Sequence, residues 1–267
     1  MIYVGYLLAL MVGITLGLMG SGGSILTVPI LHYVLDVDVV SATAYSLFIV
    51  GSTAMVGAVR HALQKNIDYR TMLLFGIPSM VAVYCTRLFL VPQLPDTLIS
   101  TGSLVLTKED ALLLLFAVLM VLAAIRMIRP DQQASTDSIQ QPSSGLSWGL
   151  MLQGLGVGML SGLVGAGGGF LMIPAMVLLA KIPMKKAVGT SLAVIAAQSL
   201  IGFTGDLQQP MIFDWILILI FTSMAILGIF IGMWLTRFFS GDRLKTGFGW
   251  FVLAMGVYIL FSKLIGF

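Results

Sequence analysis

The stretch Gly17-Leu-Met-Gly-Ser-Gly-Gly-Ser-Ile-Leu-Thr-Val-Pro29 decides the fold of this chain. It is a glycine-rich interruption of an apolar run, and it recurs as Gly162-Leu-Val-Gly-Ala-Gly-Gly-Gly-Phe-Leu-Met-Ile-Pro174 with the glycines and the proline at the same relative positions. A helix that is interrupted twice at equivalent places indicates a membrane protein built from two copies of one unit, with its working site at the interruptions.

The match between the two halves continues well beyond the glycines at one constant offset. Val12, Gly13, Ala42, Ser46, Leu47 and Gly57 match Val157, Gly158, Ala187, Ser191, Leu192 and Gly202. After a short insertion in the second copy, Thr86-Arg87 recurs as Thr236-Arg237. Chance does not produce such a gap-free match, so we interpret the chain as an internal repeat.

The composition places the chain in a membrane. Hydrophobic residues make up 58% and charged residues 9% of the chain, whereas a soluble domain has about 25% charged residues. Apolar runs predict five helical segments in each half, and the first run is interpreted as a structural element rather than a cleaved leader because it lacks a positively charged start. The predicted segments are 2–19, 24–35, 42–59, 71–91 and 111–128, followed by 148–164, 169–180, 187–204, 211–236 and 244–264.

A polar stretch separates the halves, which predicts a first membrane repeat at 1–128, a cytoplasmic linker at 129–147 and a second repeat at 148–267. Lysine and arginine in short loops mark the cytoplasmic side. Matched loops carry opposite charge bias: Asp36 and Asp38 against Lys181, Lys185 and Lys186; Arg60, Lys65 and Arg70 against Asp206 and Asp214. The predicted fold is therefore an all-α polytopic membrane protein with two inverted-topology repeats and both termini outside.

The glycine-rich breaks are predicted to be broken or re-entrant helical hairpins. The piece 169–180 would be about 18 Å long at about 1.5 Å per residue, which is short of the roughly 30 Å hydrocarbon core. The two hairpin tips would therefore lie within the membrane and enter it from opposite sides. Non-helical backbone is tolerated there only where it is buried in protein or lines a wet cavity.

Consecutive glycine amides can converge on one point and bind an anion, so the breaks are the predicted substrate site. Its predicted residues are Gly20, Ser21, Gly22, Gly23 and Ser24 in the first copy, and Gly165, Ala166, Gly167, Gly168 and Gly169 in the second. The alternative role of glycine is close helix packing, and we favour that role for Gly13, Gly17, Gly158 and Gly162.

Polar side chains on the third segment of each half extend the predicted site, namely Ser46, Thr190, Ser191 and Gln198. Hydroxyls in membrane helices also bond their own backbone, and that alternative stays open. Arg87, near the outer end of its segment, either snorkels to the interface or recruits anions at the outer mouth. Asp206 and His61 are interpreted as loop or interface groups. With no carboxylate then left inside an apolar segment, the sequence argues against proton coupling.

These motifs resemble the TauE/SafE family of sulfite and organosulfonate exporters over nearly the whole chain. The resemblance rests on Gly20 to Pro29, on Gly165 to Pro174 and on Lys186-Ala-Val-Gly-Thr-Ser-Leu192, close to the family's Ala-x-Gly-Thr-Ser-Leu. The first copy departs from that pattern at Ala42-Thr-Ala-Tyr-Ser-Leu47. The resemblance implies an inner-membrane carrier that exports small sulfur-containing anions such as sulfite or sulfoacetate.

The predicted function is a secondary transporter that works by alternating access and is driven by the membrane potential. An anion channel and an ion-coupled importer are the alternatives. An intramembrane serine protease using Ser21 is excluded by Met19, because its site would need glycine there. No metal, cofactor or nucleic acid is expected; the expected partners are the small anion and the lipid bilayer, and both a monomer and a homodimer remain open.

Overall fold

The structure is a computed structural model that describes residues 2–20, 23–95, 97–101, 104–128, 146–165, 172, 184–235 and 241–265. These ranges are almost entirely helical, which confirms the all-α class. The first half contains α1 (Ile2–Met19), α2 (Ser24–Pro29), α3 (Val39–Leu63), α4 (Tyr69–Cys85), α5 (Val91–Gln93) and α6 (Lys108–Ile128), with π-helical segments η1 (Ile30–Val34) and η2 (Thr86–Leu90). The second half contains α7 (Leu146–Val164), α9 (Met184–Asp206), α10 (Trp215–Leu235) and α11 (Gly241–Ile265). The predicted linker lies almost wholly, and the predicted piece 169–180 all but residue 172, outside the described residues.

Four helical spans in the described part of the chain are long and apolar enough to cross a membrane. They are Val39–Leu63, Tyr69–Gln93, Lys186–Asp206 and Trp215–Leu235. Large apolar side chains such as Ile216, Trp234 and Phe261 are exposed on the outside of the bundle. Such an apolar exterior is what a protein surrounded by lipid requires, because lipid tails and not water contact it.

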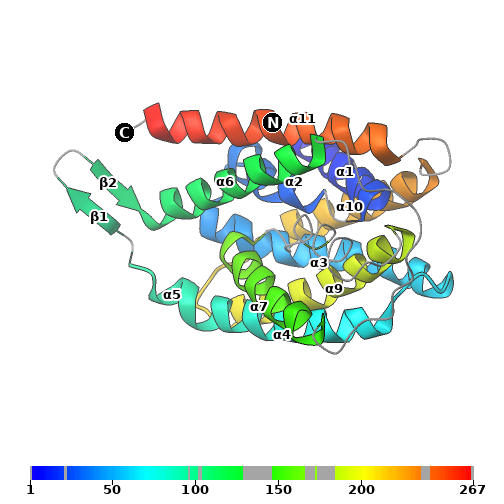
Figure 1. Cartoon of the computed structure of the whole chain (residues 1–267). Coiled ribbons are helices and arrows are strands. Elements are labelled where there is room, and N and C mark those ends of the chain that lie inside the picture. The colour runs from blue at the N-terminus through cyan, green and yellow to red at the C-terminus, as the bar shows by residue number, and fades with distance from the viewer. Residues whose placement is uncertain are drawn as a thin grey trace.

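A short antiparallel hairpin connects α5 to α6. Its strands are β1 (Thr97–Thr101) and β2 (Leu104–Thr107), and it projects from one end of the helix bundle (Figure 1). Both strands are rich in threonine, leucine and β-branched residues, which suit a pleated ladder. The predicted segments 71–91 and 111–128 leave this stretch as a connection between two helices, and the hairpin forms within it.

The helices pack in pairs, and each pair joins one helix of the first half to one helix of the second half. Helix α1 packs against α10 and α7 against α4, while α3 pairs with α9 and α6 with α11. Figure 1 shows α6 and α11 along one edge of the bundle, α4 and α7 along the opposite edge, and α3 and α9 between them. The central pair is also more enclosed than α4 and α10. Within the apolar stretch of each span, 67% of the residues of α3 and 72% of those of α9 are buried, against 44% for the spans of α4 and α10.

Two matched contacts show how α3 meets α9. Gly57 lies against Leu192, and Gly202 lies against Leu47. Leu192 is the counterpart of Leu47, and Gly202 is the counterpart of Gly57. The same glycine–leucine contact therefore occurs twice. Since low residue numbers of α3 meet high residue numbers of α9, the two helices run antiparallel.

Glycines hold the outer pairs together, as the packing interpretation predicted. Gly13 lies against the backbone of Ala225, and Gly158 lies against the backbone of Ser79. A Cβ on Gly17 would come 2.5 Å from the carbonyl oxygen of Ile229, and one on Gly162 would come 2.8 Å from Cβ of Thr86. These positions accept no side chain without separating the helices, which confirms close packing at all four glycines.

The two glycine breaks begin with the same backbone geometry. Gly20 ends α1 at φ 74°, and Gly165 ends α7 at φ 71°. Their N–H groups donate to the carbonyls of Leu16 (2.7 Å) and Ser161 (2.8 Å). A left-handed residue that returns its N–H to the last turn is a common helix ending, and glycine adopts it without strain. The two breaks thus share one backbone geometry at their first glycine.

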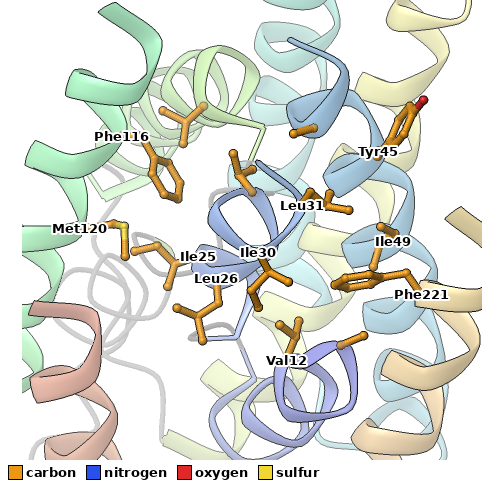
Figure 2. Close-up of a cluster of buried hydrophobic side chains, with 14 of the residues drawn as sticks. Val12, Ile25, Leu26, Ile30, Leu31, Tyr45, Ile49, Phe116, Met120 and Phe221 are labelled. Carbon is orange, nitrogen blue, oxygen red and sulfur yellow. The ribbon is translucent and has the colours of Figure 1, made fainter. Parts of the chain in front are cut away.

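The segment that follows the first break is enclosed by apolar side chains. Figure 2 shows Ile25, Leu26, Ile30 and Leu31 of α2 and η1 among side chains from α1, α3, α6 and α10. Pro29 lacks an N–H, so the carbonyl of Ile25 has no ordinary helical donor, and the chain continues from Pro29 into a π-helical turn.

Candidate anion site

The candidate site centres on Arg87, which η2 carries into the interior of the bundle. This π-helical segment follows α4 without a break and precedes Pro92. Because Pro92 has no N–H for the carbonyl of Leu88, that carbonyl instead faces the side-chain amide of Gln209 at 3.5 Å. Single π-helical turns are frequent at functional sites because they turn side chains away from the regular helical face.

The guanidinium of Arg87 is fully buried, at 0% exposure. Its Nη1 donates to Oγ1 of Thr43 at 3.0 Å and approaches Oδ1 of Asp206 at 3.4 Å. The hydroxyl of Thr43 donates in turn to the carbonyl of Val40 at 2.7 Å, which fixes its oxygen as an acceptor for Arg87. Helices α3, η2 and α9 thus each contribute one polar side chain to a single point.

The second glycine break lies directly against this point. A Cβ on Gly165 would come 2.6 Å from Nη2 of Arg87 and would collide with Thr43. At the matched position of the first half, a Cβ on Gly20 would collide with Val188, which is the counterpart of Thr43 at the constant offset. Each break therefore contacts the third segment of the other half at equivalent positions, but among the described residues only the second break meets a charge there.

The ion pair leaves much of its hydrogen-bonding capacity unused. Nε and Nη2 of Arg87 and Oδ2 of Asp206 have no hydrogen-bond partner among the described residues. Removing one ion from water costs several kcal/mol, and a single contact at 3.4 Å recovers less than a bidentate arginine–carboxylate pair does. Buried donors left open in this way require an explanation, and a bound anion supplies one.

A second polar group lies along the same helices. Ser79 of α4 donates to Oε1 of Gln198 on α9, and Nε2 of Gln198 donates to Oγ of Ser161 on α7 at 3.5 Å. Ser79 precedes Arg87 by eight residues, and Gln198 precedes Asp206 by eight residues. This spacing is about 12 Å of helix in each case. We call this line of buried polar groups between α4, α7 and α9 the polar seam, defined by Gln198, Ser79, Ser161, Thr43, Arg87 and Asp206.

The structure brings part of the predicted site together here. Gly165 and Gln198 belong to the polar seam or touch it, and Ser46 lies one turn after Thr43 on α3 with a buried hydroxyl that has no partner in the described ranges. Gly20 lies beside Val188 at the other break, where Gly23 precedes the buried Ser24 of α2. Ser21, Gly22, Ala166, Gly167, Gly168 and Gly169 fall outside the described residues.

Two predicted residues make contacts within the protein. Oγ1 of Thr190 accepts the backbone N–H of Asp68 at 2.9 Å, and Ser191 donates to the carbonyl of Val188 at 2.9 Å. Asp68 caps the first turn of α4, so the bond from Thr190 fixes the start of that helix. Their assignment to the substrate site remains a prediction.

Two expectations for charged residues are wrong. Arg87 does not snorkel, because its side chain is enclosed and bonded inside the bundle. Asp206 is not a loop group: α9 extends to it, and 2% of the residue is exposed. A carboxylate therefore lies at the end of an apolar helix, and the argument against proton coupling loses its premise. The sequence signal for this pair was Arg87, which goes against the positive-inside preference. An arginine that does not reach the membrane surface is buried, and a buried charge needs a partner of opposite sign.

With the geometry established, comparison with known proteins identifies the family. The family model described as "Sulfite exporter TauE/SafE" matches residues 6–259. The chain belongs to the TauE/SafE family. A "Probable membrane transporter protein" of Xylella fastidiosa is 28% identical over 95% of this chain and 92% of its own length.

Other organisms carry similar proteins. A protein of Methanocaldococcus jannaschii with the same description is 33% identical over 76% of this chain and 69% of its own length, and one of Bacillus subtilis is 30% identical over 73% and 74%. No solved structure matches the chain. This member of the TauE/SafE family is therefore a membrane transporter, and its cargo and mechanism are taken up next.

Proposed function

We propose that this TauE/SafE protein exports small sulfur-containing anions such as sulfite and sulfoacetate across the inner membrane. The observation that carries the proposal is the buried Arg87. Its Nε and Nη2 have no hydrogen-bond partner among the described residues, and Nη2 lies against the second glycine break. A guanidinium offers a planar fork of donors that fits two oxygens of a sulfonate or sulfite group at once. The family's description supports the sulfur-containing cargo.

Alternating access is the mechanism that fits an enclosed site. Arg87 and Gln198 are both 0% exposed, so in this conformation neither can be reached from water without movement of the helices. A channel would need a continuous wet path, whereas a carrier opens an occluded site to one side at a time. The burial of the polar seam therefore favours the carrier over the channel.

The movement follows from two repeats that we propose to be inverted, at 1–128 and 148–267. Three observations support inversion: the antiparallel packing of α3 and α9, the exchanged contacts of Gly57 and Gly202, and the opposite charge bias of matched loops. The same loop charges support termini on the outer side of the membrane. Rocking one repeat against the other would then expose the site alternately to each side.

The membrane potential supplies the outward drive. An interior that is negative by 100 mV gives about 2.3 kcal/mol for each net negative charge that leaves the cell. The second candidate, coupling to another ion, is favoured by one specific observation, the buried carboxylate of Asp206.

A flux experiment tests the proposal. The purified protein in liposomes is given sulfite, sulfoacetate, sulfate, acetate or thiosulfate at a set membrane potential. Saturable flux of the sulfite or sulfonate anions that responds to the sign of the potential is expected. Equal movement of all five anions without saturation would indicate a channel, and no movement of any of them would overturn the proposed function.

A further inference from the structure

The carboxylate of Asp206 lies beside the donors of Arg87 that the proposed anion would bind. It approaches Nη1 of Arg87 at 3.4 Å, and the pair is enclosed by α3, α4, α7 and α9. We infer that Asp206 takes up one proton whenever an anion binds Arg87, so that anion and proton cross the membrane together. This inference rests on the proposed anion transport and specifies its coupling ion.

The charge balance of the enclosed site leads to this conclusion. In the structure the positive Arg87 and the negative Asp206 sum to zero. A bound anion adds at least one negative charge to a site that is 0% exposed at Arg87 and 2% at Asp206. An unbalanced charge in such a place is strongly disfavoured, and protonation of Asp206 restores neutrality when the bound anion carries a single charge on its binding group.

In the part of the chain that the structure describes, the surrounding elements offer no other cation to balance the charge. Among the described residues Arg87 of η2 is the charged group that acts on Asp206. Thr43 on α3 contributes a hydroxyl and α7 contributes the backbone of Gly165. The titratable side chain one turn earlier on α4, Tyr84, accepts a bond from Gln208 at 2.9 Å. A proton is therefore the cation that fits the space available.

The proton step balances without any further reactant. While the site is open to one side, Oδ2 of Asp206, which has no partner among the described residues, gains a proton from water on that side. The neutral acid no longer balances the charge of Arg87, and the anion binds at its Nε and Nη2. After the site opens to the other side the anion leaves, the acid returns its proton to water, and the pair of Arg87 with Asp206 forms again.

The inference fixes the net charge of transport. A divalent anion such as sulfoacetate carries one net negative charge when one proton accompanies it, so the membrane potential still drives it outward. A monovalent sulfonate moves with no net charge, so the membrane potential does not act on it and its flux follows the gradients of the anion and of pH. The two classes of anion are thus expected to differ in their response to the potential.

Proton coupling can be measured on the unaltered protein. Liposomes containing the full chain and a trapped pH dye receive radiolabelled sulfoacetate, and anion flux, proton flux and current are recorded together. One proton and one net charge per anion are expected. Binding of sulfoacetate to the purified protein should strengthen about tenfold for each unit of pH lowered between about pH 8 and about pH 6, where the anion's own charge is constant.

A variant and a matched control complete the test. Asp206→Asn should remove proton flux, raise the current to two charges per anion and make binding independent of pH. Asp36→Asn is the control, because it makes the same change on an exposed residue whose φ of 55° asparagine tolerates. If Asp206→Asn does not fold, the wild-type proton count decides alone.

The outcomes are separable. Anion flux with no accompanying proton in the wild-type protein, or an unchanged proton count in folded Asp206→Asn, would overturn the coupling and leave anion transport intact. Absence of any anion flux in the wild-type protein would overturn both proposals.

Discussion

The polar seam between α4, α7 and α9 has an equivalent between α10, α1 and α3, and the two differ in chemistry. Where the polar seam has Gln198 and Ser161, the constant offset gives Thr53 and Leu16, and where Gly158 meets Ser79, the matched Gly13 meets Ala225. Leu16 and Ala225 are buried apolar residues, and the hydroxyl of Thr53 bonds its own helix at Ile49. Thr43 and Asp206 likewise correspond to Val188 and His61. We call this second line the apolar seam.

The difference teaches that repeated backbone geometry does not imply two equal half-sites. Both breaks start with a left-handed glycine and both contact the opposite third segment. Only one of the two places, among the described residues, joins a guanidinium and a carboxylate. The common scaffold provides two related breaks in the helices, and the proposed anion site uses the one whose side chains include a guanidinium.

The largest effect is expected from removing the arginine charge of the polar seam. Arg87→Gln should lower anion flux about 100-fold or more, because charge-assisted hydrogen bonds contribute about 1.5–3 kcal/mol each and two of them are lost. Arg70→Gln, on the exposed start of the same helix, is the control and should leave flux unchanged.

Stability must be separated from binding in that variant. Leaving Asp206 buried without a partner costs about 3–5 kcal/mol, so Arg87→Gln should also lower the melting temperature. The double variant Arg87→Gln with Asp206→Asn restores neutrality and should recover most of the stability without recovering transport. Transport by the folded double variant would refute the role of Arg87.

A second change compares the two breaks directly. Gly165→Ala and Gly20→Ala both place a side chain at a left-handed φ, which costs about 1–2 kcal/mol in each case, and both meet a neighbour of the opposite half. Similar losses of thermal stability are expected. Flux should fall about tenfold further in Gly165→Ala, because only that Cβ displaces Arg87. Equal flux in the two variants would show that the breaks are functionally equivalent.

A third change gives the polar seam the residue of the apolar seam. Gln198→Thr leaves the hydroxyls of Ser79 and Ser161 without their partner, which should cost about 1–3 kcal/mol and reduce flux about tenfold. Thr53→Ala is its counterpart in the apolar seam and should change stability by less than about 1 kcal/mol, since the lost bond is local to its own helix. Thermal unfolding and flux on both variants measure the contrast.

The smallest effect concerns two matched serines. Ser46→Ala removes a buried hydroxyl that has no partner in the described part of the chain, so stability should stay within about 1 kcal/mol while anion affinity falls a few-fold. Ser191→Ala removes a bond to its own helix and should leave affinity unchanged. An affinity loss at Ser191 equal to that at Ser46 would argue for two similar half-sites.

The repeat, the membrane class and the helix bounds were accessible from the sequence because they depend on local patterns. Apolar runs, paired glycines and prolines mark where helices start and end, and the segments predicted at 42–59 and 187–204 differ from α3 and α9 by a few residues at each end. The packing role of Gly13 and Gly158 followed from their spacing alone.

The polar seam was not accessible in the same way. Arg87 and Asp206 are 119 residues apart, and neither has a local sequence feature that names its partner. Their contact depends on how α4, α7 and α9 pack, which single-sequence patterns do not fix. The constant offset could have suggested it, because Asp206 and His61 occupy matched positions and differ in charge. Asp206 follows the predicted apolar segment 187–204, so the apolar pattern alone places it in a loop rather than in the interior.

The most direct test of the account is equilibrium binding of radiolabelled sulfoacetate to the purified protein and to Arg87→Gln with Asp206→Asn. The account predicts saturable binding by the wild-type protein and a loss of about 100-fold or more in the double variant, at a similar melting temperature. Equal affinity of the two proteins would contradict the central claim that Arg87 in the polar seam holds the anion.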